Sequence, residues 1–123
     1  MIYASWIELP AKDVKRAATF YQAVFEFDAG EAYDDGERRV AILINPADGR
    51  PGVSLNQTKD FEPSSKGTLM YLNVGNDLAP FLTRTVAAGG RVMTPETAMS
   101  PTSVYAIIQD TEGNAVALSF SQE

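Results

Sequence analysis

Two segments of the chain carry apolar residues at the three- and four-residue spacing of an amphipathic helix. The first runs from Val14 to Phe25 and follows Asp13, a residue type favoured at helix N-caps. Its apolar positions are Val14, Ala17, Ala18, Tyr21, Val24 and Phe25. The second runs from Leu78 and stops at the glycine pair 89–90. The pattern therefore predicts two helices.

The surroundings of these helices repeat along the chain. A strand-like run, residues 2–9, precedes Asp13, and a similar run, residues 69–74, precedes Asp77. Three further stretches that alternate or carry β-branched residues follow each helix. They are 27–33, 39–44 and 52–56 in the first half, and 91–94, 104–109 and 115–120 in the second. The chain therefore predicts two β-α-β-β-β modules, about 1–60 and 67–121, in a single domain that spans 1–123. Two β-α-β-β units in a ferredoxin-like dimeric barrel are the alternative, although that fold needs fewer strands.

Composition removes several classes of partner. The 123 residues carry a formal charge of −6, which would repel nucleic acid and anionic membranes. There is no cysteine, so disulfides and thiolate chemistry are excluded. Residues 1–9 lack the basic flank and long apolar stretch of a signal peptide, and no apolar run reaches ~18 residues. We therefore expect a cytoplasmic protein with no nucleic-acid or membrane partner.

Three groups of residues match one known fold in order and spacing. The matching residues are Trp6 to Pro10 with Asp13, Arg16-Ala17, Phe20-Tyr21 and Val24-Phe25; Tyr71 to Val74 with Asp77-Leu78 and 87–92; and Asp110 to Asn114. Together they resemble the vicinal oxygen chelate superfamily, which includes glyoxalase I, bleomycin-resistance proteins and extradiol dioxygenases. The resemblance covers nearly the whole chain and implies an α+β fold. In that fold the two modules form a cupped mixed sheet with helices on the convex side and the ligand in the concave groove.

The same resemblance locates the metal ligands of the enzymatic members, which are His, Gln and Glu on the first and last strands of each module. These positions fall on Trp6, on Leu69 or Met70, on Ala117, and on or beside Ser54. None of these side chains is a metal ligand of normal strength, and the chain contains no histidine. We therefore expect no metal and no cofactor.

Strand alternation separates the residues that face the helices from those that face the groove. In the last strand Val116, Leu118 and Phe120 are the large apolar set, so they should pack under the helices. The residues expected to face the groove and bind a ligand are Trp6, Glu8, Ser54, Asn56, Tyr71, Asn73, Tyr105 and Ser119. Aromatic, small and neutral polar residues around one carboxylate are typical of a small-molecule pocket. The alternatives are core packing for Trp6, cross-strand packing for Tyr71 and Tyr105, and a solvated carboxylate for Glu8.

Two classes of function follow. The first is a metal-independent protein of the glyoxalase/bleomycin-resistance type that binds a small, partly aromatic molecule between Trp6 and Tyr71. The alternative is a divergent glyoxalase-like lyase or isomerase that uses Glu8 as general base or within an atypical metal site, so catalysis stays open. A pure dimerisation module is a third class. Members of the superfamily commonly pair, and a small cupped sheet would leave strand edges exposed, so we expect a homodimer.

Overall fold

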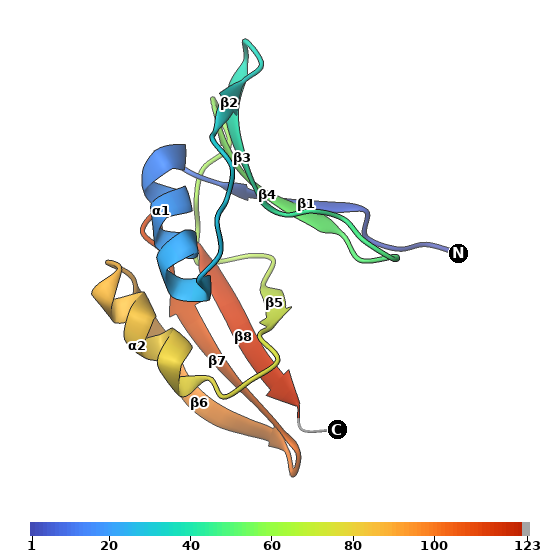
Figure 1. Ribbon diagram of the computed structural model, residues 1–123, viewed down its shortest axis with the longest axis vertical. Helices are drawn as coiled ribbons and strands as arrows, with labels where there is room; N and C mark the ends of the chain where they lie inside the picture. The colour runs from blue at the N-terminus through green and yellow to red at the C-terminus, as the bar shows by residue number, and fades with distance from the viewer. Residues whose placement is uncertain (122–123) are drawn as a thin grey trace.

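Each half of the chain folds as a strand, a helix and three further strands. The structure is a computed structural model that describes residues 1–121 (Figure 1). The first module contains β1 (Trp6–Pro10), α1 (Val14–Phe25), β2 (Tyr33–Asp34), β3 (Arg38–Ile44) and β4 (Gly52–Thr58). The second contains β5 (Met70–Asn73), α2 (Ala79–Ala87), β6 (Arg91–Ser100), β7 (Ser103–Gln109) and β8 (Ala115–Ser121). This order confirms the α+β fold with two β-α-β-β-β modules.

Each module pairs its strands into a mixed four-stranded sheet. The strand order is β1-β4-β3-β2 in the first sheet and β5-β8-β7-β6 in the second. The first strand of each module runs parallel to the last strand, while the remaining neighbours are antiparallel. The helix between the first and second strands supplies the long connection that this arrangement needs. Among residues 1–121, β1 and β5 are edge strands that each pair with one neighbour.

The first helix is capped by a side chain at its start, whereas the second begins without a side-chain cap. Asp13 Oδ1 accepts hydrogen bonds from the N–H groups of Lys15 and Arg16, both at 3.1 Å, as expected for an N-cap. Glu26 ends α1 in a left-handed conformation with φ of 55°. The second helix begins at Ala79, one residue later than Leu78, and has a proline in its first turn, where a missing N–H costs nothing.

One hydrophobic core serves both modules. It contains β4 residues Val53 and Leu55, β8 residues Val116 and Leu118, and the buried face of α1. Figure 1 shows α1 and α2 next to each other, with the sheet of the first module above and that of the second below. Because both sheets turn their apolar faces toward this shared core, their opposite faces point away from each other.

The turn between β7 and β8 connects the second module to the start of α1. Asp110 Oδ1 accepts from the N–H groups of Glu112, Gly113 and Asn114, which fixes the turn. Tyr21 of α1 donates its hydroxyl to Asp110 Oδ2 at 2.6 Å. Burial, followed by the neighbouring Asp110 carboxylate, raises the pKa of Tyr21 well above its usual value. The phenol therefore stays protonated and acts as a donor that holds the modules together.

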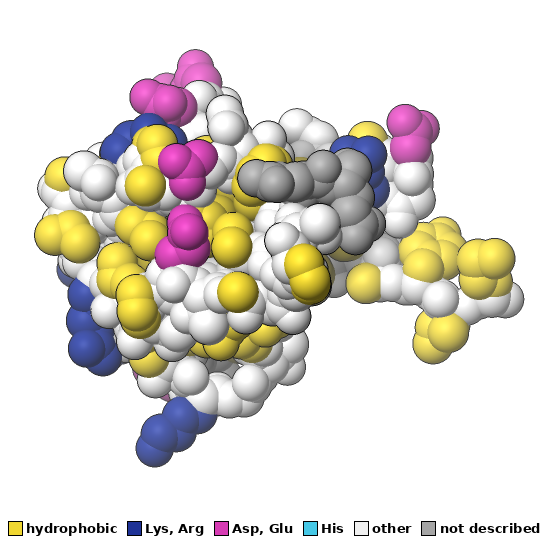
Figure 2. Space-filling model, turned by 90° about the horizontal axis from the view of Figure 1, so that it is seen from below, with side chains coloured by type: hydrophobic (Ala, Val, Ile, Leu, Met, Phe, Trp, Pro, Cys, Tyr) yellow, Lys and Arg dark blue, Asp and Glu magenta, His cyan; other side chains and the backbone are white. Residues whose placement is uncertain are grey.

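The start of the chain projects from the body of the molecule. Residues 1–5 extend past β1, and the side chains of Met1, Ile2 and Tyr3 are exposed. Apolar side chains gather on this projecting lobe at the right of Figure 2. Among residues 1–121, no helix is long and apolar enough to cross a bilayer.

Candidate functional site

The pairing of β1 with β4 places four of the predicted site residues on one face of the first sheet. Glu8 lies opposite Ser54 in the register, while Trp6 lies opposite Gly52. The intervening residues, including Leu9, Val53 and Leu55, point into the core. The faces that strand alternation predicts for these residues therefore agree with the structure. Trp6 lies on the face away from the helices.

A directional chain of hydrogen bonds joins these side chains. Trp6 Nε1 donates to Ser54 Oγ at 3.0 Å, and Ser54 Oγ donates to Asn56 Oδ1 at 2.7 Å. Asn56 Nδ2 then donates to Glu8 Oε2 at 3.1 Å. Ser54 and Asn56 are each only 1% exposed, whereas Trp6 is 41% exposed. Two buried polar groups thus hold two solvent-facing side chains in place.

Arg38 extends this chain, and it was missing from the predicted site. Its Nη1 donates to Glu8 Oε2 at 2.8 Å, and its Nε donates to Asp35 Oδ2 at 3.0 Å. The hydrogen bonds that Arg38 donates, first to Asp35 and then to Glu8, raise the pKa of Arg38. Strand alternation could have indicated this residue, because extending β3 back to Arg38 puts Arg38 on the same face as Val40 and Ile42.

Apolar groups complete the face around these polar contacts. Val40 lies opposite Asn56, Ile42 lies opposite Ser54, and Tyr33 of β2 lies opposite Val40. The indole of Trp6 lies over Gly52, where a Cβ atom would come within 2.5 Å of the ring. In the described part of the chain, the face is therefore an apolar surface with one fixed polar row, a composition typical of small-molecule binding surfaces.

The other predicted site residues lie on the outer face of the second sheet. Tyr71 is opposite Ala117, and Ser119 lies between Asn73 on β5 and Tyr105 on β7. Tyr71 is 52% exposed. The Oδ1 atom of Asn73 accepts from the N–H of Gly75 at 2.8 Å, so this side chain also stabilises the turn after β5.

Within one chain the two faces do not form a common pocket. The sheets share a core, so the Trp6 face and the Tyr71 face point in different directions. Among residues 1–121, no hydrogen bond or ring contact joins Trp6 or Glu8 to Tyr71, Asn73 or Tyr105. The expectation that Trp6, Glu8 and Tyr71 line one groove is therefore not met by a single chain. Pseudo-symmetry relates these residues without bringing them together.

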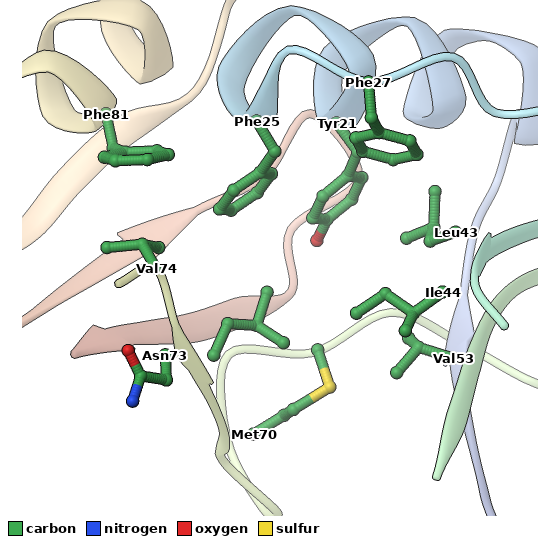
Figure 3. Close-up of a pocket in the computed structure, with 11 residues that line it drawn as sticks. Tyr21, Phe25, Phe27, Leu43, Ile44, Val53, Met70, Asn73, Val74 and Phe81 are labelled. Carbon is green, nitrogen blue, oxygen red and sulfur yellow. The ribbon is translucent and has the colours of Figure 1, made fainter. Parts of the chain in front are cut away.

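An apolar pocket of about 370 Å³ opens on the core side, between the modules (Figure 3). Aromatic side chains of the two helices and of the segment after α1 lie along one side, and residues of β3, β4 and β5 lie along the other. The lining residues are Tyr21, Phe25, Phe27, Leu43, Ile44, Val53, Met70, Leu72, Asn73, Val74 and Phe81. The hydroxyl of Tyr21 already donates to Asp110. Apart from the Tyr21 hydroxyl and the Asn73 amide, the described lining of this pocket is apolar and includes no Asp, Glu, His, Lys or Arg.

The residues at the expected metal-ligand positions do not fit a metal ion. Trp6 donates its N–H to Ser54, and Ala117 is fully buried and has no donor atom in its side chain. Within the described residues, no group of three or more His, Cys, Asp or Glu side chains is placed to hold a metal. Trp6 and Ala117 therefore supply no ligand to a metal at these positions.

Comparison with known proteins identifies the fold and the family. The model of the Glyoxalase/Bleomycin resistance protein/Dioxygenase superfamily matches residues 4–118. A glyoxylase-like domain-containing protein from Didymella fabae is 30% identical over 117 residues, which cover 93% of this chain and 90% of that protein.

Solved structures with similar folds have low sequence identity. A glyoxalase/bleomycin resistance protein/dioxygenase family enzyme from Burkholderia phytofirmans PsJN has a TM-score of 0.73 at 18% identity, covering 98% of this chain and 99% of that one. The fosfomycin resistance protein FosX from Listeria monocytogenes has a TM-score of 0.70 at 12% identity, covering 99% and 95%. At these identities the similarity establishes the fold alone, and any chemistry has to be inferred from the residues of the site.

Proposed function

Because the chain belongs to the glyoxalase/bleomycin resistance protein/dioxygenase superfamily, we propose that it binds a small molecule without a metal, on the face that carries Trp6. The superfamily hosts many activities on one fold, so the proposal rests on the site. The resemblance to this superfamily assigns Trp6 to a metal-ligand position of the enzymatic members, and the N–H of Trp6 is already bonded to Ser54.

The observation that carries this proposal is the burial of Ser54 and Asn56 on the side of β4 that faces away from the core. Burying polar side chains costs free energy unless their hydrogen bonds are made. Here the bonds are made with Trp6 and Glu8, whose side chains are partly exposed. Such a network stabilises a fixed arrangement of an aromatic ring and a carboxylate, which is what a binding surface needs.

We further propose that the working form is a homodimer in which the Trp6 face of one copy meets the Tyr71 face of another. Each face is open in the single chain, and the projecting lobe exposes Met1, Ile2 and Tyr3. Exposed apolar patches of this kind favour association. In such a dimer the two sets of predicted site residues would enclose one groove. Location in the cytoplasm stays a prediction from the sequence.

Binding is tested with the protein's sole tryptophan. A library of small aromatic compounds is added to metal-free protein while the indole N–H signal of Trp6 is followed by NMR. We expect some compounds to shift this signal and to raise the melting temperature, since a ligand of the folded state stabilises it. A Trp6→Ala variant should lose the stabilisation. If no compound moves the Trp6 signal, the binding proposal fails.

The dimer is tested by mixing two variants, Trp6→Ala and Tyr71→Ala. The Tyr71→Ala variant keeps Trp6, but in a dimer of two such chains Trp6 would face alanine at position 71. Mixed dimers would bring Trp6 of one chain to Tyr71 of the other, so the ligand response should return on mixing. A chain with both substitutions should not restore it. Exchange of subunits without any recovery would refute the shared groove.

A role of Glu8 as general base is the second candidate. Arg38 and Asn56 both contact Oε2, which leaves Oε1 as the oxygen that a substrate could meet. For a binding protein, Glu8→Gln should change the affinity for a neutral ligand only modestly. For an enzyme it should lower the rate about 10²-fold or more while binding is kept. Turnover of the hemithioacetal of methylglyoxal and glutathione is a direct first assay.

A further inference from the structure

The indole of Trp6 is held from two directions. Its N–H is fixed to Ser54, and its six-membered ring fills the space above Gly52. A Cβ atom at Gly52 would lie 2.5 Å and 2.7 Å from two ring carbons and 3.0 Å from Cδ of Pro46. Glycine at this position therefore lets the ring lie close to the strand. The ring offers a flat apolar surface whose orientation is set before any ligand arrives.

Beside this ring, the side chains of Arg38 and Glu8 form an ion pair in which some hydrogen-bonding atoms have no protein partner among the described residues. Arg38 and Glu8 share a single contact, from Nη1 to Oε2 at 2.8 Å. Within the described residues, Glu8 Oε1 and Arg38 Nη2 make no hydrogen bond. The ion pair therefore has one acceptor oxygen and one donor nitrogen without a protein partner in the described part of the chain, on two side chains that touch at 2.8 Å.

The charges around this pair disfavour a charged ligand. An anion would be attracted by Arg38 but would meet the carboxylates of Glu8 and Asp35. A cation would be attracted by these carboxylates but would meet the guanidinium of Arg38. A charged ligand would also have to give up its hydration without a full partner of opposite charge. A neutral group that carries both a donor and an acceptor can use Oε1 and Nη2 together.

The spacing sets the shape of the ligand. Trp6 and Glu8 are two residues apart on β1, and two residues of a strand span about 6–7 Å. A single ring stacked on the indole therefore reaches Glu8 with a substituent of two or three atoms.

We propose that this face selects a neutral planar ring that bears a carboxamide-type group, with the ring on Trp6 and the amide between Glu8 and Arg38. The inference rests on the proposed function, and it names the class of ligand that this function would take. It also makes Gly52 a positioning residue, since its lack of a side chain permits the Trp6 orientation.

Four compounds of nearly equal size test this inference. Benzamide is planar and neutral, benzoate carries a negative charge, and benzamidine carries a positive charge. Cyclohexanecarboxamide keeps the neutral amide but lacks the planar ring. Each is titrated into the full chain while the indole N–H signal of Trp6 is followed. Titrations use about 0.15 M salt, where the Debye length of about 8 Å screens the overall negative charge of the protein.

We expect benzamide to bind most tightly, with a Kd on the order of 1 mM, as suits a compound with so few atoms. Benzoate and benzamidine should bind roughly fivefold or more weakly because neither charge is matched by a free counter-charge. Cyclohexanecarboxamide should also be several-fold weaker because it loses the stacking contact. Tighter binding of benzoate or of benzamidine would overturn the inference while leaving the proposed function intact. Equal binding of the two amides would refute the stacking on Trp6.

A pair of glycine variants separates the role of Gly52 from general effects on folding. Gly52→Ala should displace the indole, change its N–H signal in the free protein, and weaken benzamide binding about tenfold. Gly30→Ala is the matched control, because a Cβ atom there meets nothing within 4 Å. An unchanged Trp6 signal in folded Gly52→Ala would refute the positioning role. If none of the four compounds moves the signal while compounds of another class do, the ligand class is wrong but the binding proposal stands. If nothing moves it, both fail.

Discussion

Glu112 provides the sharpest test of how the two modules are joined. This residue lies in the turn between β7 and β8, and its side chain is fully buried. It accepts two hydrogen bonds from Arg16, one from Thr111, and one each from the N–H groups of Lys12 and Asp13. One carboxylate of the second module thus fixes the start of the helix of the first.

The expected cost of changing this residue follows from those bonds. Glu112→Ala removes all of them and leaves buried donors without a partner, so it should cost about 3–4 kcal/mol. Glu112→Gln keeps one acceptor oxygen but places an amide opposite Arg16. This variant should lower the free energy of unfolding by about 2 kcal/mol. The loss is this small because Arg16 is half exposed and solvent screens its interaction with Glu112.

The same contacts make the effect depend on pH. Burial alone would raise the pKa of Glu112, but hydrogen bonds from Arg16, Asp13 and Thr111 outweigh it and hold this pKa below its usual 4.5. A carboxylate with a lowered pKa in the folded state stabilises the fold above its unfolded pKa. This contribution is lost as the pH falls through the folded pKa. The difference in the free energy of unfolding between wild type and Glu112→Gln should therefore be constant at neutral pH and decrease below about pH 4.5.

Urea denaturation at a series of pH values measures these differences. Glu96→Gln is a suitable control, because Glu96 is exposed on β6 and its side chain makes no hydrogen bond or ion pair in the described part of the chain. A loss below about 1 kcal/mol for Glu112→Ala would refute the role of this carboxylate. A difference between wild type and Glu112→Gln that grows on acidification would also refute it.

Three further outcomes test the packing and the assembly. Tyr21→Phe removes the hydroxyl that donates to Asp110 at 2.6 Å, and should cost about 1–2 kcal/mol in chemical denaturation. Gly90→Ala would place a Cβ atom 2.6 Å from the ring of Phe20 and should cost about 2 kcal/mol, whereas Gly30→Ala should cost little. Light scattering at micromolar concentration should give twice the chain mass of 13.3 kDa, and a monomer mass would contradict the proposed dimer.

Much of the fold could be predicted because periodicity reports local structure. The apolar spacing from Val14 to Phe25 predicted the bounds of α1 because one face of this helix is buried. Strand ends were less predictable. The first strand begins at Trp6, since residues 1–5 extend beyond the sheet. The sixth strand continues past Pro95 to Ser100, because shifts in the register remove the need for a proline N–H in the ladder.

The face on which a side chain lies could be predicted within a sheet, but the relation between the two sheets could not. Alternation along β1 and β4 placed Trp6 and Glu8 on one face with Ser54, because side-chain direction in a strand is a local property. The separation of Trp6 from Tyr71 depends on how both sheets pack around a shared core, and no pattern within a strand encodes that packing. Arg38 was missed because its partner Glu8 lies on another strand.

The central claim is that the Trp6 face binds a small molecule and not a metal ion, and the Trp6 indole signal tests it most directly. Protein stripped of metal with a chelator is titrated in parallel with benzamide and with zinc, nickel and manganese. We expect the indole signal and the melting temperature to respond to the organic compound and to be unchanged by each ion at micromolar concentration. A shift of the Trp6 signal with any of these ions, accompanied by an increase in the melting temperature, would contradict it.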